Sequence, residues 1–92
     1  MAKKISILIV DDEESVRDSL YNWFIEDGYD VECAENARKA LSILESEGFD
    51  IILADIKMPG MDGLEMLKRI KALRKDSIVI IMTAFATVDT AV

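Results

Sequence analysis

Residues 49–63 read F-D-I-I-L-A-D-I-K-M-P-G-M-D-G, and this stretch places a carboxylate at the end of a predicted buried strand. The apolar run from Ile51 to Ala54 is short and uninterrupted, which is typical of an interior parallel strand. It stops at Asp55, and the Pro-Gly and Asp-Gly pairs that follow favour a loop. Open α/β sheets bind ligands at the carboxyl ends of their strands, so Asp55 is a candidate reactive group.

Short apolar runs and amphipathic segments alternate on both sides of this stretch. The runs predicted as strands are Ile5 to Val10, Asp30 to Ala34, Phe49 to Asp55 and Ile78 to Met82. The second is the least apolar and is therefore expected at a sheet edge. Strands that alternate with helices predict an α/β fold, a doubly wound parallel sheet with right-handed crossovers.

The segments between the strands have helical periodicity. Val16, Leu20, Trp23 and Phe24 form one apolar stripe, which we expect in the core, and Gly28 is a predicted left-handed cap. Asn36 is the predicted N-cap of a second helix with Ala37, Ala40, Leu41 and Leu44 on its apolar face. A third helix is expected from Leu64 to Leu73, and Thr87 to Val92 has the pattern of a helix start.

The composition favours a small cytoplasmic domain. Ninety-two residues, 51% of them hydrophobic, suffice for one core. A net charge of −7 argues against direct binding to nucleic acid or to an anionic membrane. Cys33 is the single cysteine and forms no internal disulfide, and no apolar run is long enough for a membrane helix. The sequence has no histidine and thus no phosphohistidine of its own.

Three predicted strands end in polar residues, which should meet on one rim of the sheet. These residues are Asp11 and Asp12, Asp55, and Thr83. Clustered carboxylates without cysteine or histidine select a hard divalent ion, for which Mg²⁺ is the best fit. A carboxylate beside Mg²⁺ can attack phosphorus and form an acyl phosphate. The residues therefore predict phosphoryl capture by an aspartate.

These residues together resemble a response-regulator receiver domain of a two-component system. The resemblance rests on Asp11-Asp12 after the first strand, on Asp55 followed by K-M-P-G-M-D-G at positions 57–63, and on Thr83-Ala84 after the fourth strand. It covers the whole chain, so residues 1–92 are assigned to one receiver domain. It implies a flavodoxin-like topology with strand order 2-1-3-4.

The resemblance also implies the chemistry of the site. Asp55 is the implied phosphoacceptor, which takes its phosphoryl group from the phosphohistidine of a sensor histidine kinase. The implied Mg²⁺ ligands are Asp12, Asp55 and the backbone carbonyl of Lys57, with Asp11 acting through water. Such a module catalyses only its own phosphorylation and dephosphorylation and is not otherwise an enzyme.

Two further residues are implied to report phosphorylation. Thr83 is the implied switch hydroxyl that bonds the phosphate, and Ala84 is the small neighbour that leaves the phosphate accessible. The switch is expected to control an output such as transcription. Residues 85–91, F-A-T-V-D-T-A, are similar to receivers joined to enhancer-binding ATPases.

One departure from the family pattern leads to a structural expectation. Receivers continue into a fifth strand, which carries a phosphate-binding lysine, and a fifth helix, but no lysine follows Thr83 here. We therefore expect a C-terminally truncated receiver whose strand Ile78 to Met82 lies at a sheet edge. Such an edge favours self-association.

Alternative functions remain open from the sequence. The chain could be a self-associating structural half-domain that is not phosphorylated. A Mg²⁺-dependent phosphohydrolase with an aspartyl nucleophile is disfavoured, because such enzymes need an acid two residues after the nucleophile and Lys57 stands there. Asp11 to Glu14 could also be a plain charge cluster at a helix start, and Thr83 a cap residue.

Overall fold

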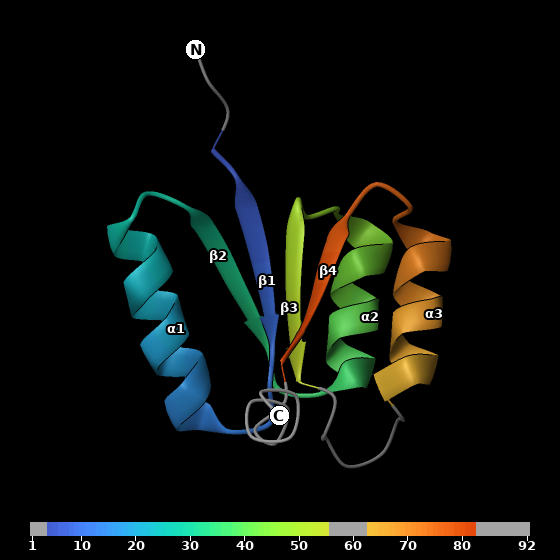
Figure 1. Ribbon diagram of the computed structural model, residues 1–92, viewed down its shortest axis with the longest axis horizontal. Helices are drawn as coiled ribbons and strands as arrows, with labels where there is room; N and C mark the ends of the chain where they lie inside the picture. Colours follow the sequence, from blue (N-terminus) through green and yellow to red (C-terminus); the bar gives the residue numbers. More distant parts are fainter. Residues whose placement is uncertain (1–3, 56–62, 83–92) are drawn as a thin grey trace, which may run out of the picture.

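The computed structural model describes residues 4–55 and 63–82, which form four strands and three helices in alternation (Figure 1). The elements are β1 (Ser6–Val10), α1 (Glu14–Glu26), β2 (Asp30–Ala34), α2 (Ala37–Ser46), β3 (Ile51–Asp55), α3 (Gly63–Leu73) and β4 (Ile78–Met82). The four predicted strands are present, and two of them begin one or two residues later than expected. The helix start predicted at Thr87 to Val92 lies outside the described residues.

The strands form one parallel sheet in the order β2-β1-β3-β4, as predicted. All four arrows in Figure 1 point the same way. Within the described residues β2, the least apolar strand, is at one edge and β4 at the other, whereas the almost fully buried β1 and β3 are central. The uninterrupted apolar sequences of β1 and β3 follow from this position, because both of their faces are covered.

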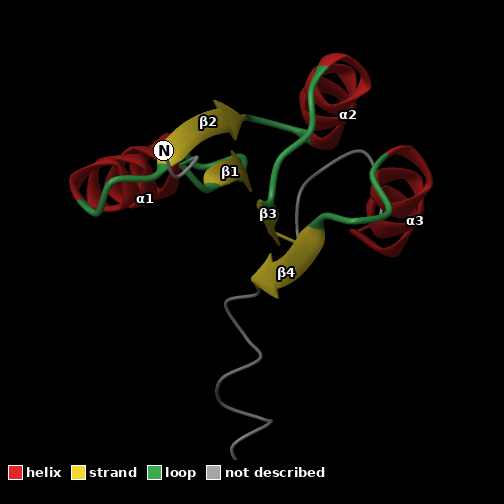
Figure 2. Ribbon diagram, turned by 90° about the horizontal axis from the view of Figure 1, so that it is seen from above, coloured by secondary structure: helices red, strands yellow, loops and turns green. Residues whose placement is uncertain are grey.

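The two faces of the sheet are covered by different helices (Figure 2). Leu8, Val10, Ile52 and Ala54 pack with residues of α2 and α3 in one buried cluster. The alternate strand residues Ile7, Ile9 and Leu53 form a second cluster, against which Leu20 and Phe24 of α1 pack. The two-residue periodicity of the strands thus sends successive side chains into separate cores.

Both predicted helix caps are present. The Asn36 side chain accepts a hydrogen bond of 2.8 Å from the backbone N–H of Lys39, in the first turn of α2. At the end of α1, Gly28 has a φ of 94°. The Gly28 N–H donates to the Ile25 carbonyl and the Tyr29 N–H to the Phe24 carbonyl, which is a Schellman motif. The rings of Phe24 and Tyr29 meet edge to face across it.

The prediction that Trp23 lies in the core is wrong. Its residue surface is 64% exposed, although its ring stacks on that of Phe24 with centroids 6.1 Å apart. Helix α1 packs mainly over β2 and β1, and none of its thirteen residues is fully buried. The sheet contact is therefore made by the Leu20 and Phe24 side of the helix, and Trp23 lies on its flank.

A polar network joins the opposite, amino-terminal ends of the strands. The Asp50 carboxylate accepts hydrogen bonds from the backbone N–H and the hydroxyl of Ser6 at 2.9 and 3.2 Å. The Ser77 hydroxyl donates to the Phe49 carbonyl at 2.6 Å. These bonds align the starts of β1, β3 and β4, and so they help to set the register that the carboxyl ends share. Among the described helices, none has the length and apolar character of a membrane span.

Candidate functional site

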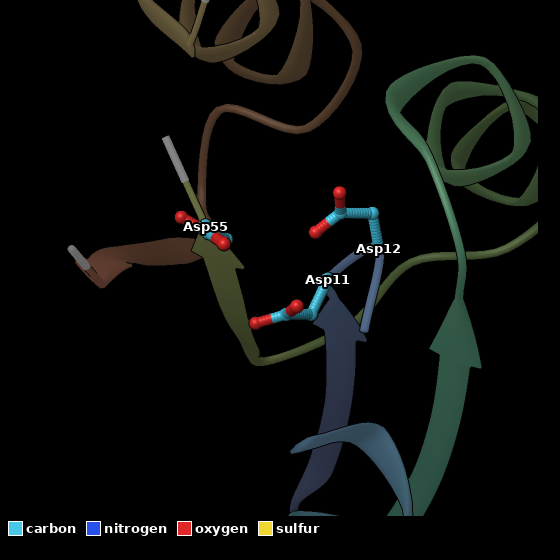
Figure 3. A group of neighbouring side chains, drawn as sticks. All are labelled: Asp11, Asp12 and Asp55. Atoms are coloured by element: carbon cyan, nitrogen blue, oxygen red, sulfur yellow. The ribbon is translucent and has the colours of Figure 1, made fainter. Parts of the chain in front are cut away.

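Three carboxylates meet at the carboxyl ends of the central strands (Figure 3). Asp11 follows β1 directly, Asp12 comes next in the β1–α1 loop, and Asp55 is the last residue of β3. Val10 pairs with Ala54 in the parallel ladder, so the next residues, Asp11 and Asp55, are adjacent at the ends of the two strands. One oxygen from each carboxylate lies within 4.8 Å of the others. The predicted convergence of these three side chains is confirmed.

Asp11 is the most buried of the three, with 5% of its surface exposed, and its position is held at three points. Its backbone N–H donates to the Ala34 carbonyl of β2 at 3.1 Å. Its Oδ1 accepts from the backbone N–H of Glu13 at 2.9 Å, and its carbonyl accepts from Nη1 of Arg17 at 2.8 Å. The loop that carries Asp11 and Asp12 is therefore fixed to both β2 and α1.

The electrostatics of the cluster favour a cation. Burial raises the pKa of Asp11, and the charges of Asp55, Asp12 and Glu13 raise it further, against the opposing effect of the Glu13 N–H bond. Asp12 is exposed and Asp55 half-buried, so the cluster is open to solvent on one side. An ion could therefore enter from this side and relieve the repulsion.

The donor set fits a hard divalent ion such as Mg²⁺. All three candidate ligands are carboxylate oxygens, which Mg²⁺ prefers over softer metals. With metal–oxygen distances of 2.0–2.1 Å, two ligands of one Mg²⁺ lie at most about 4.2 Å apart. The observed spread of up to 4.8 Å fits two direct carboxylates and one bridged by water, or a small rotation of one side chain.

The other predicted site residues lie outside the described residues. These are Lys57, Thr83 and Ala84. Met82, the residue before Thr83, is the ladder partner of Asp55, so the described part of β4 ends beside the cluster. The roles predicted for the three residues stay predictions.

Arg17 is a site residue that the sequence reasoning did not single out. Its contact with the Asp11 carbonyl links α1 to the acidic loop. A signal was present, because Arg17 is a basic residue in the first turn of a helix that begins at the last of four consecutive acids. Such a helix start otherwise disfavours positive charge, so a cation there has a specific partner.

A comparison with known families identifies the family to which the chain belongs. The family described as "Response regulator receiver domain" matches residues 7–92. The chain belongs to this family. This receiver domain is 46% identical over 83 residues to sporulation initiation phosphotransferase F of Bacillus subtilis, covering 90% of this chain and 67% of that protein. It is 45% identical over 86 residues to the regulatory protein AtoC of Escherichia coli, covering 94% of this chain. It spans only 19% of the length of AtoC.

Solved structures of receivers agree with this assignment. A CheY-like receiver from Methanospirillum hungatei superposes with a TM-score of 0.88 at 36% identity, covering 97% of this chain and 71% of that one. The response regulator TrrA of Thermotoga maritima, in complex with Mg²⁺ and BeF, superposes with a TM-score of 0.83 at 37% identity. The match covers 94% of this chain and 75% of TrrA. The structure of the histidine kinase ThkA in complex with TrrA gives a TM-score of 0.81 at 40% identity, and the match covers 88% of this chain and 70% of that one.

Proposed function

We propose that residues 1–92 are a phosphoacceptor receiver domain of a two-component system in which Asp55 accepts the phosphoryl group. The observation that carries this proposal is the meeting of Asp11, Asp12 and Asp55 at the carboxyl ends of β1 and β3. Membership of the receiver family and the Mg²⁺–BeF complex of TrrA support it. A cytoplasmic location is part of the same proposal.

In the proposed reaction, a carboxylate oxygen of Asp55 attacks the phosphorus of a phosphohistidine. A phosphorus–oxygen bond forms, the phosphorus–nitrogen bond breaks, and the electron pair of that bond leaves with the imidazole nitrogen of the donor. Mg²⁺, when bound, neutralises negative charge on the transferring phosphoryl oxygens.

The chain's own residues have distinct parts in this proposal. Asp12 and Asp55, with the carbonyl of Lys57, would hold the ion directly, and Asp11 would act through water. Oδ1 of Asp11 accepts the Glu13 N–H, so the other carboxylate oxygen is the one proposed to act through water. Thr83 and Ala84 would form the switch that reports the phosphoryl group.

The donor is proposed to be a sensor histidine kinase, as suggested by the complex of ThkA with TrrA. The output is proposed to be regulatory, because one similar protein is named a regulatory protein and another a transcriptional regulatory protein. The net charge of −7 argues against direct contact with nucleic acid by this domain.

Acetyl phosphate with Mg²⁺, followed by mass spectrometry, tests the proposal. We expect the mass of one phosphoryl group to be added at Asp55, with little free phosphate released over the same period. Asp55→Asn removes the nucleophile at nearly constant size and should abolish the adduct. Rapid, sustained phosphate release would favour a phosphohydrolase instead. Unmodified wild-type protein would contradict the proposal and favour the structural alternative.

Self-association is proposed as a second property of the chain, because β4 exposes apolar side chains. Ile78 and Ile80 are 60% and 45% exposed. Within residues 4–55 and 63–82, β4 also has a strand neighbour on one side only. Exposed edges with apolar side chains pair readily with other strands, so a second copy of this chain is the proposed partner.

A further inference from the structure

Arg17 reaches from the first turn of α1 to the backbone of the acidic loop. Its Nη1 donates a 2.8 Å hydrogen bond to the carbonyl oxygen of Asp11, six residues earlier in the chain. The residue is half-buried, and the contact itself is partly shielded from solvent. A partly buried hydrogen bond from a charged donor contributes more to stability than one from a neutral donor.

The bond completes a set of restraints around one residue. The backbone N–H of Asp11 is held by β2, its side chain by Glu13, and its carbonyl by Arg17. Of the three, only the Arg17 bond comes from a side chain of the helix body. It fixes the peptide between Asp11 and Asp12, because the carbonyl oxygen and the following N–H share one rigid plane.

The orientation of that peptide determines where both acidic side chains lie. If it turned, Asp12 would move relative to Asp11, and the carboxylate oxygens would no longer lie within 4.8 Å of Asp55. Three like charges left alone favour such a movement, since separation lowers their repulsion. A restraint against it is therefore useful at this point of the loop.

We propose that Arg17 is a positioning residue of the metal site, which holds the Asp11–Asp12 peptide so that both carboxylates face Asp55. The inference rests on the proposed Mg²⁺ site and extends it to a residue that does not contact the ion. Mutation of residues that hydrogen-bond to the ligands of a metal site commonly lowers the affinity for the metal by about 10–100-fold. We expect an effect near the lower end of that range, because Arg17 holds a backbone group rather than a ligand atom.

A Mg²⁺ titration followed by the amide NMR shifts of Asp11, Asp12 and Asp55 tests the inference. Arg17→Gln should weaken binding about tenfold. Arg38→Gln is the matched control, since it removes the same charge from an exposed position on α2 and should bind within about twofold of wild type. Arg17→Lys keeps a charged donor and should recover most of the affinity.

The outcomes separate the inference from the proposed function. Failure of the wild-type protein to bind Mg²⁺ contradicts the proposed site. If the wild-type protein binds Mg²⁺ and the Arg17→Gln and Arg38→Gln variants bind it with equal affinity, the role of Arg17 is overturned but the proposed site is not. Urea unfolding without Mg²⁺ gives a further readout, because a purely structural role lowers the unfolding midpoint but leaves the Mg²⁺ affinity of the folded protein unchanged.

A measurement on the wild-type protein keeps the inference testable if Arg17→Gln does not fold. Hydrogen bonding slows the exchange of guanidinium protons with water, so the Arg17 protons should exchange more slowly than those of Arg38. Addition of Mg²⁺ should slow them further if the ion and the peptide orientation are linked. Exchange at Arg17 that is unaffected by Mg²⁺ would overturn the inference.

Discussion

Asp11 is held in an unfavourable environment when no cation is bound. It is buried beside two other carboxylates and has a raised pKa, mainly because of burial. Two unit charges at 4.8 Å repel by roughly 1 to 3.5 kcal/mol for effective dielectric constants between water and a protein surface. The folded protein thus retains at this residue an arrangement that lowers its stability but suits a metal ion.

Replacing Asp11 by asparagine should stabilise the metal-free protein. Asparagine keeps an oxygen to accept the Glu13 N–H but removes the charge, so the free energy of unfolding at neutral pH should rise by about 1 kcal/mol or more. Urea unfolding measures this change, with exposed Glu45→Gln as a control for loss of charge. A lower stability of Asp11→Asn would show that repulsion in the cluster is not the dominant effect. The same substitution should weaken Mg²⁺ binding.

The Cys33 thiol gives a pH-dependent prediction. Burial raises its pKa; the Arg17 charge opposes the rise, whereas the charges of Asp18 and Glu32 add to it. Alkylation by iodoacetamide, which needs the thiolate, should therefore reach its half-maximal rate at a higher pH than for a free cysteine. Arg17→Gln should move this midpoint higher still. A midpoint at or below that of free cysteine would contradict the burial of the thiol.

The sign of the linked stability follows from the same shift. A thiol whose pKa is higher in the folded state contributes stability that is fully present below the unfolded-state pKa. This stability is lost as the pH rises through the folded-state pKa. The free energy of unfolding should therefore decline in alkaline solution, and Cys33→Ser should lessen the decline.

At the scale of single elements, the end of α1 depends on one backbone conformation. Gly28 has a positive φ, and the Schellman hydrogen bonds on either side of it direct the chain from α1 into β2. Because β2 pairs with β1 along its whole length, the same turn also sets where the Ala34 carbonyl meets the Asp11 N–H. The cap of α1 thus contributes indirectly to the position of the acidic loop.

Gly28→Ala should lower the free energy of unfolding by about 1 kcal/mol, because a Cβ is disfavoured at positive φ. Space is not the cause, since a Cβ at Gly28 would have no neighbour within 4 Å. Gly48→Ala is the matched control: its new Cβ would make ordinary contacts with the Arg74 side chain, at 3.5 Å and beyond. Thermal or urea unfolding of the two variants should show a clear loss for Gly28→Ala and little change for Gly48→Ala. Equal effects would mean that the backbone conformation at Gly28 is not the cause.

At the scale of the whole molecule, the two faces of the sheet are unequally covered in the described part of the chain. The α2 and α3 face buries ten residues completely or almost so. The opposite face is covered by α1, which lies over β2 and β1 (Figure 2). Ile78 and Ile80 of β4 are exposed.

Self-association through β4 should depend on its exposed side chains. Size-exclusion chromatography with light scattering at micromolar concentration should show the wild-type chain larger than a monomer. Ile80→Lys should shift it toward the monomer, since charge on an exposed edge strand opposes pairing. Ile25→Lys, at a similarly exposed isoleucine on α1, is the control and should leave the size unchanged. A wild-type chain that is monomeric at all concentrations would contradict the proposal.

The amino-acid sequence by itself determined the elements, the parallel sheet and the meeting of three aspartates. Apolar runs such as Ile51 to Ala54 mark buried strands because both of their faces need cover, and Asn36 and Gly28 mark helix ends through local backbone geometry. In parallel strands the carboxyl ends lie together, so the sequence alone predicts that Asp11 and Asp55 are neighbours. These inferences depend on short-range sequence patterns and on the rule that the carboxyl ends of parallel strands lie at the same edge of a sheet.

Only the tertiary structure decided how these parts meet. Helical periodicity assigned Trp23 to the same stripe as Phe24, but the position of α1 over β2 and β1 left it 64% exposed. The bond from Arg17 to the Asp11 carbonyl depends on how the loop turns between β1 and α1, which no spacing rule specifies. Burial and single hydrogen bonds are set by packing between distant segments, and this is why the sequence predicted the acidic cluster but not the residue that holds it in place.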